Sequence, residues 1–141
     1  MDEVFLVAKC KRNSSVLNRV TYMKVEEPNK PYLQDLIITN ATLDKLVKDI
    51  RNCIIYVSDK SHINLINNAL GEHNSLHAPI CTLNNFVPGK SYEELPEFLN
   101  IENEDVREYL KKNFKISDVT IRSTVFKCAL MKLIYNKAYV K

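Results

Sequence analysis

The stretch NCIIYVSDKSHINLINNALG, residues 52–71, carries the pattern that decides the fold. The apolar residues 54–57 run directly into a polar turn at residues 58–62. Apolar residues at helical spacing follow, and this pattern ends at Gly71. A strand that is apolar on both faces indicates the interior of a sheet covered on both sides by helices. The stretch therefore predicts an α/β fold, in which a buried strand turns sharply into a helix.

The polar turn after this strand is the first candidate for a functional site. In open α/β sheets, ligands bind outside the carboxyl ends of the strands. Ser58 and Asp59 stand at that end of the predicted strand, and His62 follows them at the start of the helix. The turn carries either catalytic groups or only the backbone shape of a site.

The sequence before this stretch predicts a hairpin and a helix. Residues 4–11 and 15–27 are rich in strand-forming residues, and the turn-like RNSS lies between them. The segment PNKP, residues 28–31, predicts a turn or loop that interrupts the secondary structure. An amphipathic helix then begins near Thr39 or Asn40 and presents one apolar face, made of Leu43, Leu46, Val47 and Ile50.

The sequence after this stretch predicts a short strand and three helices. The strand lies within residues 77–86, and Ser91 with Glu94 forms a capping-box pattern for a short helix. A helix around residues 106–114 and a long terminal helix follow. The whole order predicts a single α/β domain over residues 1–141, with a mixed sheet and helices on both faces.

The composition excludes several classes of function. The 141 residues contain only two glycines, so a Gly-rich phosphate-binding loop is excluded. No apolar run reaches the ~18 residues that span a bilayer. The first residues are acidic, unlike those of a signal peptide. We therefore expect a cytoplasmic protein that does not enter membranes, and its four widely spaced cysteines should be free thiols.

The order of elements and their apolar spacing resemble the DnaQ-like (DEDD-type) 3′–5′ exonucleases of the ribonuclease H-like fold. Residues 4–28 resemble the second and third strands of that family, and residues 42–70 resemble its helix, buried strand and following helix. CTLNNFVPGKSYEELPEFLNI, residues 81–101, resembles its strand, loop and short helix. RSTVFKCALMKLIYNKAY, residues 122–139, resembles its last helix. The resemblance implies a ribonuclease H-like sheet.

The catalytic motifs of that family are degenerate in this chain. The family uses four carboxylates to hold two divalent metals, with a His or Tyr as general base. No D-x-E follows a predicted strand, and Ile63 stands where the Asp of the strand-to-helix turn is expected. Arg122 replaces the His of the last motif, and Lys127 replaces its Asp. Ser58, Asp59 and Ile63 are thus degenerate site positions, and the resemblance implies a pseudoenzyme without metal or cofactor.

The first hypothesis for function is a binding protein whose partner is a protein or a nucleic acid. Residues 106–141 contain nine Lys or Arg residues and two acids. This imbalance predicts phosphate contacts by Arg122, Lys127 and Lys132. The high content of Asn, Lys and Ile is typical of an AT-rich genome, which suggests a phage, viral or low-GC bacterial origin.

Two alternative functions stay open at this point. One is an active metal-dependent nuclease with rearranged acids, for which Asp59 and Asp118 are the candidates. The other is a self-associating structural subunit. If the first strand of the family were missing, the sheet would have an exposed edge, and pairing between chains would cover it.

Two other kinds of site have weaker support. His73, His77 and Cys81 have ligand types that suit zinc, but Pro79 breaks the helix that would align them. We interpret them as unrelated polar residues. A nucleophilic Ser61 or Cys81, activated by His62 or His77, would lack the glycines of a nucleophile elbow.

Overall fold

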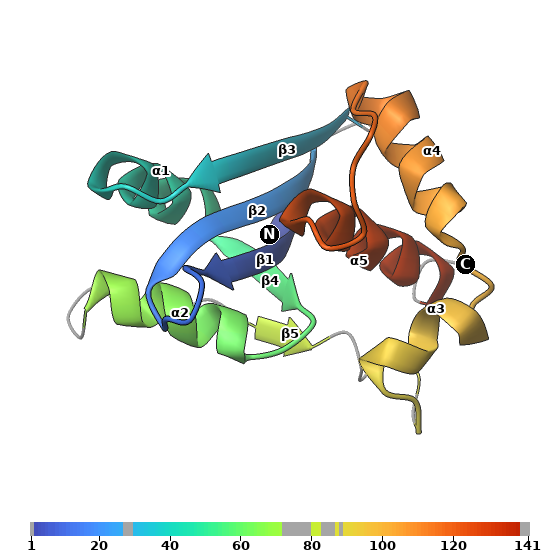
Figure 1. Cartoon of the computed structure of the whole chain (residues 1–141), viewed down its shortest axis with the longest axis horizontal. Helices are drawn as coiled ribbons and strands as arrows, with labels where there is room; N and C mark the ends of the chain where they lie inside the picture. The colour runs from blue at the N-terminus through green and yellow to red at the C-terminus, as the bar shows by residue number, and fades with distance from the viewer. Residues whose placement is uncertain (1, 27–29, 72–79, 83–86, 88, 139–141) are drawn as a thin grey trace.

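The computed structural model describes residues 2–26, 30–71, 80–82, 87 and 89–138 (Figure 1). The strands are β1 (Asp2–Cys10), β2 (Leu17–Glu26), β3 (Lys30–Ile37), β4 (Cys53–Val57) and β5 (Ile80–Thr82). The helices are α1 (Asn40–Ile50), α2 (Ser61–Leu70), α3 (Leu95–Phe98), α4 (Asn103–Phe114) and α5 (Thr124–Ala138), and a 3₁₀ turn, η3 (Tyr92–Glu94), precedes α3. In these ranges no helix combines the length and the apolarity needed to cross a bilayer.

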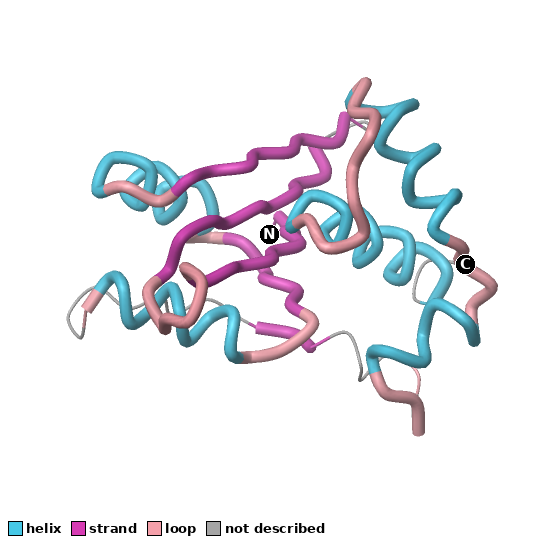
Figure 2. Tube along the Cα trace, viewed as in Figure 1, coloured by secondary structure: helices cyan, strands magenta, loops and turns pink. Residues whose placement is uncertain are grey.

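The strands form one mixed sheet in the order β3-β2-β1-β4-β5 (Figure 2). β2 runs antiparallel to its neighbours β1 and β3, whereas β1 pairs in parallel with β4, and β4 pairs in parallel with β5. Four strands therefore point the same way and end at the same side of the sheet. We call this side the carboxyl edge; it is formed by the ends of β1, β3, β4 and β5.

The predicted hairpin is confirmed as β1 and β2. The resemblance likened these strands to the second and third strands of the family, so that a missing first strand would have left the hairpin at an exposed edge. β1 pairs with β2 on one side and β4 on the other, so it is an interior strand. The sheet edges are instead β3 and β5.

The sequence does not predict β3, because the prolines of residues 28–31 indicate a loop rather than a strand. Pro31 pairs with Val25 near the start of β3. A proline lacks a backbone N–H and is tolerated on an edge strand, where no further strand needs that donor.

Alternating side chains give the sheet two apolar faces. Val4 and Leu6 of β1 pack in one core cluster with residues of α1 and α2. Phe5 and Val7 pack in a second cluster with residues of α4 and α5. The predicted α/β architecture, with helices on both faces of a mixed sheet, is confirmed.

β4 is the interior strand that residues 54–57 predicted, and it lies between β1 and β5. Ile55 is fully buried and belongs to the same cluster as Leu46 and Ile50 of α1. Tyr56 points to the opposite face, in the cluster that contains α5. Because both faces are covered, Ile55, Tyr56 and Val57 are buried, whereas Ile54, also predicted to be buried, is half-buried.

The predicted helix ends are confirmed in two cases and wrong in one. Thr39 caps α1: its hydroxyl accepts from the Thr42 backbone N–H at 3.2 Å, and the Thr42 hydroxyl accepts from the Thr39 N–H at 2.7 Å. Gly71 ends α2 with a φ of 88°, a conformation that suits glycine. The predicted capping box at Ser91 does not form, because the Ser91 hydroxyl donates to the Glu94 carboxylate and caps no backbone N–H.

Replacing Ile55 with Ala should lower the free energy of unfolding by ~2–5 kcal/mol, because it removes a fully buried side chain and leaves a cavity. Denaturant titration measures the change. Lys48→Ala is the control, since Lys48 is exposed on α1 and exposed changes usually cost under ~0.5 kcal/mol. An Ile55→Ala protein as stable as the control would contradict an interior position for β4.

Candidate functional site

Four segments meet at the carboxyl edge: the end of β1, the turn after β4, the first turn of α2 and the beginning of α5. β1 and β4 lie side by side, with Phe5 opposite Tyr56. α2 begins directly after the turn and binds β1 through His62. α5 crosses the face of β1 and β2, and its first residue, Thr124, binds Thr21 of β2 (Figure 1). The turn at residues 58–62 therefore lies beside segments from both ends of the chain.

His62 joins α2 to the end of β1. Its Nδ1 accepts a hydrogen bond from the Ala8 backbone N–H at 2.7 Å. The register of β1 with β4 ends at Phe5 and Tyr56, so the imidazole replaces the missing strand partner of Ala8. A ring nitrogen that accepts must be unprotonated, so the proton of the neutral ring is on Nε2. Burial lowers the pKa of His62, and nearby Lys127 lowers it further, against the opposing effect of Asp59.

Asp59 is exposed and serves the backbone of α2. Its Oδ1 accepts from the Ser61 backbone N–H at 2.8 Å, in the manner of an Asx turn. This hydrogen bond lowers the pKa of Asp59, so the group is a carboxylate at neutral pH. Ser58, half-buried, lies just before it.

Ile63 does not lie at this surface. Its side chain is 3% exposed and packs with Ile55 and Val57 in the cluster beneath α1 and α2. The apolar face of α2 also contains Ile66, and this face turns toward the sheet. The position that the resemblance assigned to a metal ligand is therefore part of the core.

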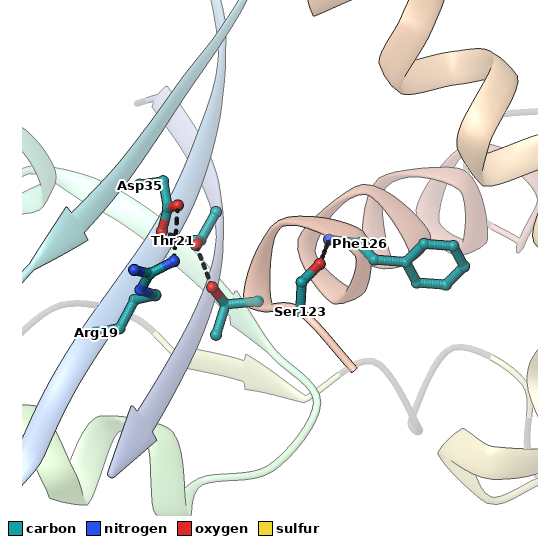
Figure 3. Close-up of polar contacts among 6 residues, drawn as sticks. Arg19, Thr21, Asp35, Ser123 and Phe126 are labelled. Carbon is teal, nitrogen blue, oxygen red and sulfur yellow. Dashed lines mark hydrogen bonds and ion pairs between the residues drawn. The ribbon is translucent and has the colours of Figure 1, made fainter. Parts of the chain in front are cut away.

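A polar network links β2, β3 and α5, and it was not foreseen from the sequence (Figure 3). Arg19 Nη1 donates to Asp35 Oδ2 at 3.3 Å. Thr21 Oγ1 lies 2.9 Å from Asp35 Oδ1 and 2.7 Å from Thr124 Oγ1. A hydroxyl has one proton and a carboxylate only accepts, so Thr21 donates to Asp35 and accepts from Thr124. Thr21 and Thr124 are buried, whereas Arg19 and Asp35 remain partly exposed.

One local signal for this network exists in the sequence. Thr21 has the same parity as Met23, which faces α5, and it stands directly opposite Asp35 in the β2–β3 pair. Alternation along β2 could therefore place Thr21 on that face. Nothing in the local pattern shows that Thr124, 103 residues away, covers it.

The three predicted phosphate-binding cations have different surroundings. Arg122 is exposed in the turn before α5, and Lys127 is exposed in the first turns of that helix. Lys132 is half-buried, with its Nζ 5.4 Å from the ring centroid of Phe5 and 5.5 Å from that of Tyr135. Burial lowers the pKa of Lys132, although Glu3 opposes this effect. Lys132 thus differs in its surroundings from Arg122 and Lys127, which are exposed.

Two further cations lie at the carboxyl edge. Lys9 is exposed at the end of β1 and stands directly opposite Arg19 of β2. Residues that are directly opposite in an antiparallel pair have neighbouring side chains on the same face. Lys9 shares its parity with Phe5 and Val7, so this face is the one that α5 covers. We call Lys9, Arg19, Arg122 and Lys127 the cationic edge.

The other candidate sites from the sequence are not assembled in the described part of the chain. His73 and His77 lie outside the described residues, and Cys81 is half-buried on β5. In the described ranges no group of three or more His, Cys, Asp or Glu residues gathers as a metal site. Asp118 lines a concavity of about 240 Å³ together with residues of α4 such as Glu108. All four cysteines are free, as predicted.

Replacing His62 with Leu should destabilise the protein at neutral pH, because it leaves the Ala8 N–H without its acceptor, which typically costs ~1–3 kcal/mol. The loss should shrink as the pH falls from about 7.5 to about 5. The pKa of His62 is lower in the folded parent than its ordinary value of about 6.5, so at lower pH the unfolded parent binds a proton there more readily than the folded parent does. Acid therefore lowers the free energy of unfolding of the parent through His62, whereas the Leu variant has no such group to protonate. Urea titrations of both proteins at each pH measure the difference. A difference that is independent of pH would contradict the neutral, accepting His62.

Comparisons with protein-family models, curated proteins and solved structures find no match to this chain. Function is therefore inferred from the side chains that meet at the carboxyl edge.

Proposed function

We propose that this chain is a catalytically inactive, exonuclease-like domain of the ribonuclease H-like type, which binds nucleic acid through the cationic edge. The strand order β3-β2-β1-β4-β5, in which only β2 is antiparallel, supports the fold assignment. The position of α5 across β1 and β2, with its first turn at the carboxyl edge, supports it as well (Figure 1).

The observation that carries the proposal is the exchange of carboxylates for cations at the carboxyl edge. A two-metal site needs several carboxylates with oxygens directed at the metals. Asp35 instead binds Arg19 and Thr21, and Asp59 binds the backbone of α2. Lys127 stands near His62, where its charge affects the imidazole. Positive charge in this position repels Mg²⁺ and attracts phosphate.

The surface favours contacts with phosphates over contacts with bases. Binding of unpaired bases normally requires exposed aromatic rings on which the bases stack. Among the described residues with large exposed apolar side chains, Phe98 is the aromatic one, and it belongs to α3. Its ring already has the ammonium of Lys90 at 5.1 Å from its centroid. We therefore expect binding that does not depend on base sequence.

A double variant, Arg122→Ala with Lys127→Ala, should weaken binding to a short fluorescent DNA duplex. It should also reduce the slope of log affinity against log salt by roughly two, since each duplex phosphate contact contributes about 0.9. Fluorescence anisotropy between about 50 and 200 mM salt measures both quantities. Lys132→Ala should leave the slope unchanged, because Lys132 lies over the rings of Phe5 and Tyr135.

Lys45→Ala with Lys48→Ala is the matched control, because it removes the same charge from exposed positions on α1. If both double variants weakened binding equally, the cationic edge would not be the binding surface. A parent protein that binds neither duplex nor single-stranded nucleic acid would favour a protein partner.

The purified protein should not digest DNA or RNA in the presence of Mg²⁺ or Mn²⁺, since Asp35 and Asp59 already bind protein groups. Gel assays with end-labelled single strands test this expectation. Digestion that disappears in an Asp59→Asn or Asp118→Asn variant would show an active nuclease with rearranged acids and would overturn the proposal.

A further inference from the structure

We propose that Arg19 is the preorganised phosphate-binding residue of the cationic edge, and that Asp35 is its positioning residue. This inference rests on the proposed function, because it assigns the central contact of the same surface. Neither residue was singled out by the sequence pattern, and the roles follow from the network that surrounds them (Figure 3).

The guanidinium of Arg19 uses few of its N–H donors in the described part of the chain. Its side chain is 38% exposed, and within the described part of the chain its hydrogen bond to Asp35 involves only Nη1. A guanidinium has five N–H donors in a planar fork. The remaining donors suit a phosphate, whose oxygens accept two parallel hydrogen bonds from such a fork.

The carboxylate of Asp35 is positioned by a hydrogen bond from the buried Thr21. Its Oδ1 accepts from the Thr21 hydroxyl at 2.9 Å, and Thr21 lies 2.7 Å from the hydroxyl of Thr124. Both threonines are buried, so their positions are determined by the packing of α5 on the sheet. The carboxylate therefore offers Oδ2 to Arg19 from a well-defined position. A side chain restricted in this way loses less conformational entropy when it binds a ligand.

The position of Arg19 places it among the other cations. Lys9 is its direct cross-strand neighbour on β1, and Thr124, the first residue of α5, joins the same network. Arg122 and Lys127 flank Thr124 in the sequence. A phosphate bound by Arg19 would thus lie near both the end of β1 and the beginning of α5.

The Asp35→Asn variant tests the positioning role, because two explanations predict opposite signs. If only total charge mattered, the loss of a carboxylate would strengthen the binding of a phosphate backbone. If Asp35 positions Arg19, the variant should weaken binding to the DNA duplex roughly tenfold, as expected when a charge-assisted hydrogen bond is lost. Asn keeps an acceptor for Thr21, so thermal melts should show an intact fold.

Asp44→Asn is the matched control, since it changes the charge equally at an exposed position on α1. It should leave duplex binding unchanged or slightly tighter. Arg19→Lys keeps the charge but removes the fork, and it should weaken binding about as much as Asp35→Asn does. The double variant should be little weaker than either single variant, because the two residues act as one unit.

Three results would overturn the inference. The first is an Asp35→Asn protein that binds the duplex as tightly as the Asp44→Asn protein. The second is fully additive effects of Asp35→Asn and Arg19→Lys. The third is an Arg19→Lys protein with parental affinity while the Arg122→Ala and Lys127→Ala variant binds weakly; the proposed function would then stand without this role for Arg19. A parent protein that binds neither duplex nor single-stranded nucleic acid would remove the proposed function together with this inference.

Discussion

The parallel pairing of β1 with β4 between two apolar layers is the constraint on which the rest of the structure depends. The pair places Val4 beside Ile55 and Phe5 beside Tyr56, and successive side chains enter the two core clusters in turn. A parallel pair must be covered on both faces, so α1 and α2 pack on one side while α4 and α5 pack on the other. The carboxyl edge exists because these strands end together, and the cationic edge is built on it.

Polar side chains complete this framework at several points where the strands and helices leave a backbone donor or a charged group to be paired. His62 accepts from Ala8 where β4 has ended, and Thr21 joins Asp35 to Thr124. At the other end of the sheet, Asp49 accepts from Tyr22 and from Lys24. Burial alone would raise the pKa of Asp49, but these two hydrogen bonds lower it. In the described residues every buried side-chain N or O atom has a hydrogen-bond partner.

The pairing of polar groups also decides which charged side chains remain exposed. The carboxylate of Glu3 accepts from Tyr56 and Tyr135, as that of Asp49 does from its own partners. Together with Asp35, these acids are used to hold strands and helices together. Lys132 is similarly used against aromatic rings, whereas Arg122 and Lys127 are left exposed. Glu3, Asp35 and Asp49 are thus engaged within the fold, whereas Arg122 and Lys127 are exposed at the carboxyl edge, which is the basis of the proposed phosphate binding.

The sequence by itself determined the local elements whose signal is short-range periodicity: α1 with its Thr39 cap, the buried strand β4, α2 ending at Gly71, and α5. It did not reveal β3, because a proline signals a break unless the segment is known to be an edge. Periodicity also placed Ile63 on the apolar face of α2, where it is buried, but only the tertiary structure decided that Arg19, Asp35 and Thr124 belong together. The physical reason is that periodicity shows which side of an element is apolar, whereas the partners of a polar side chain depend on contacts between segments far apart in the chain.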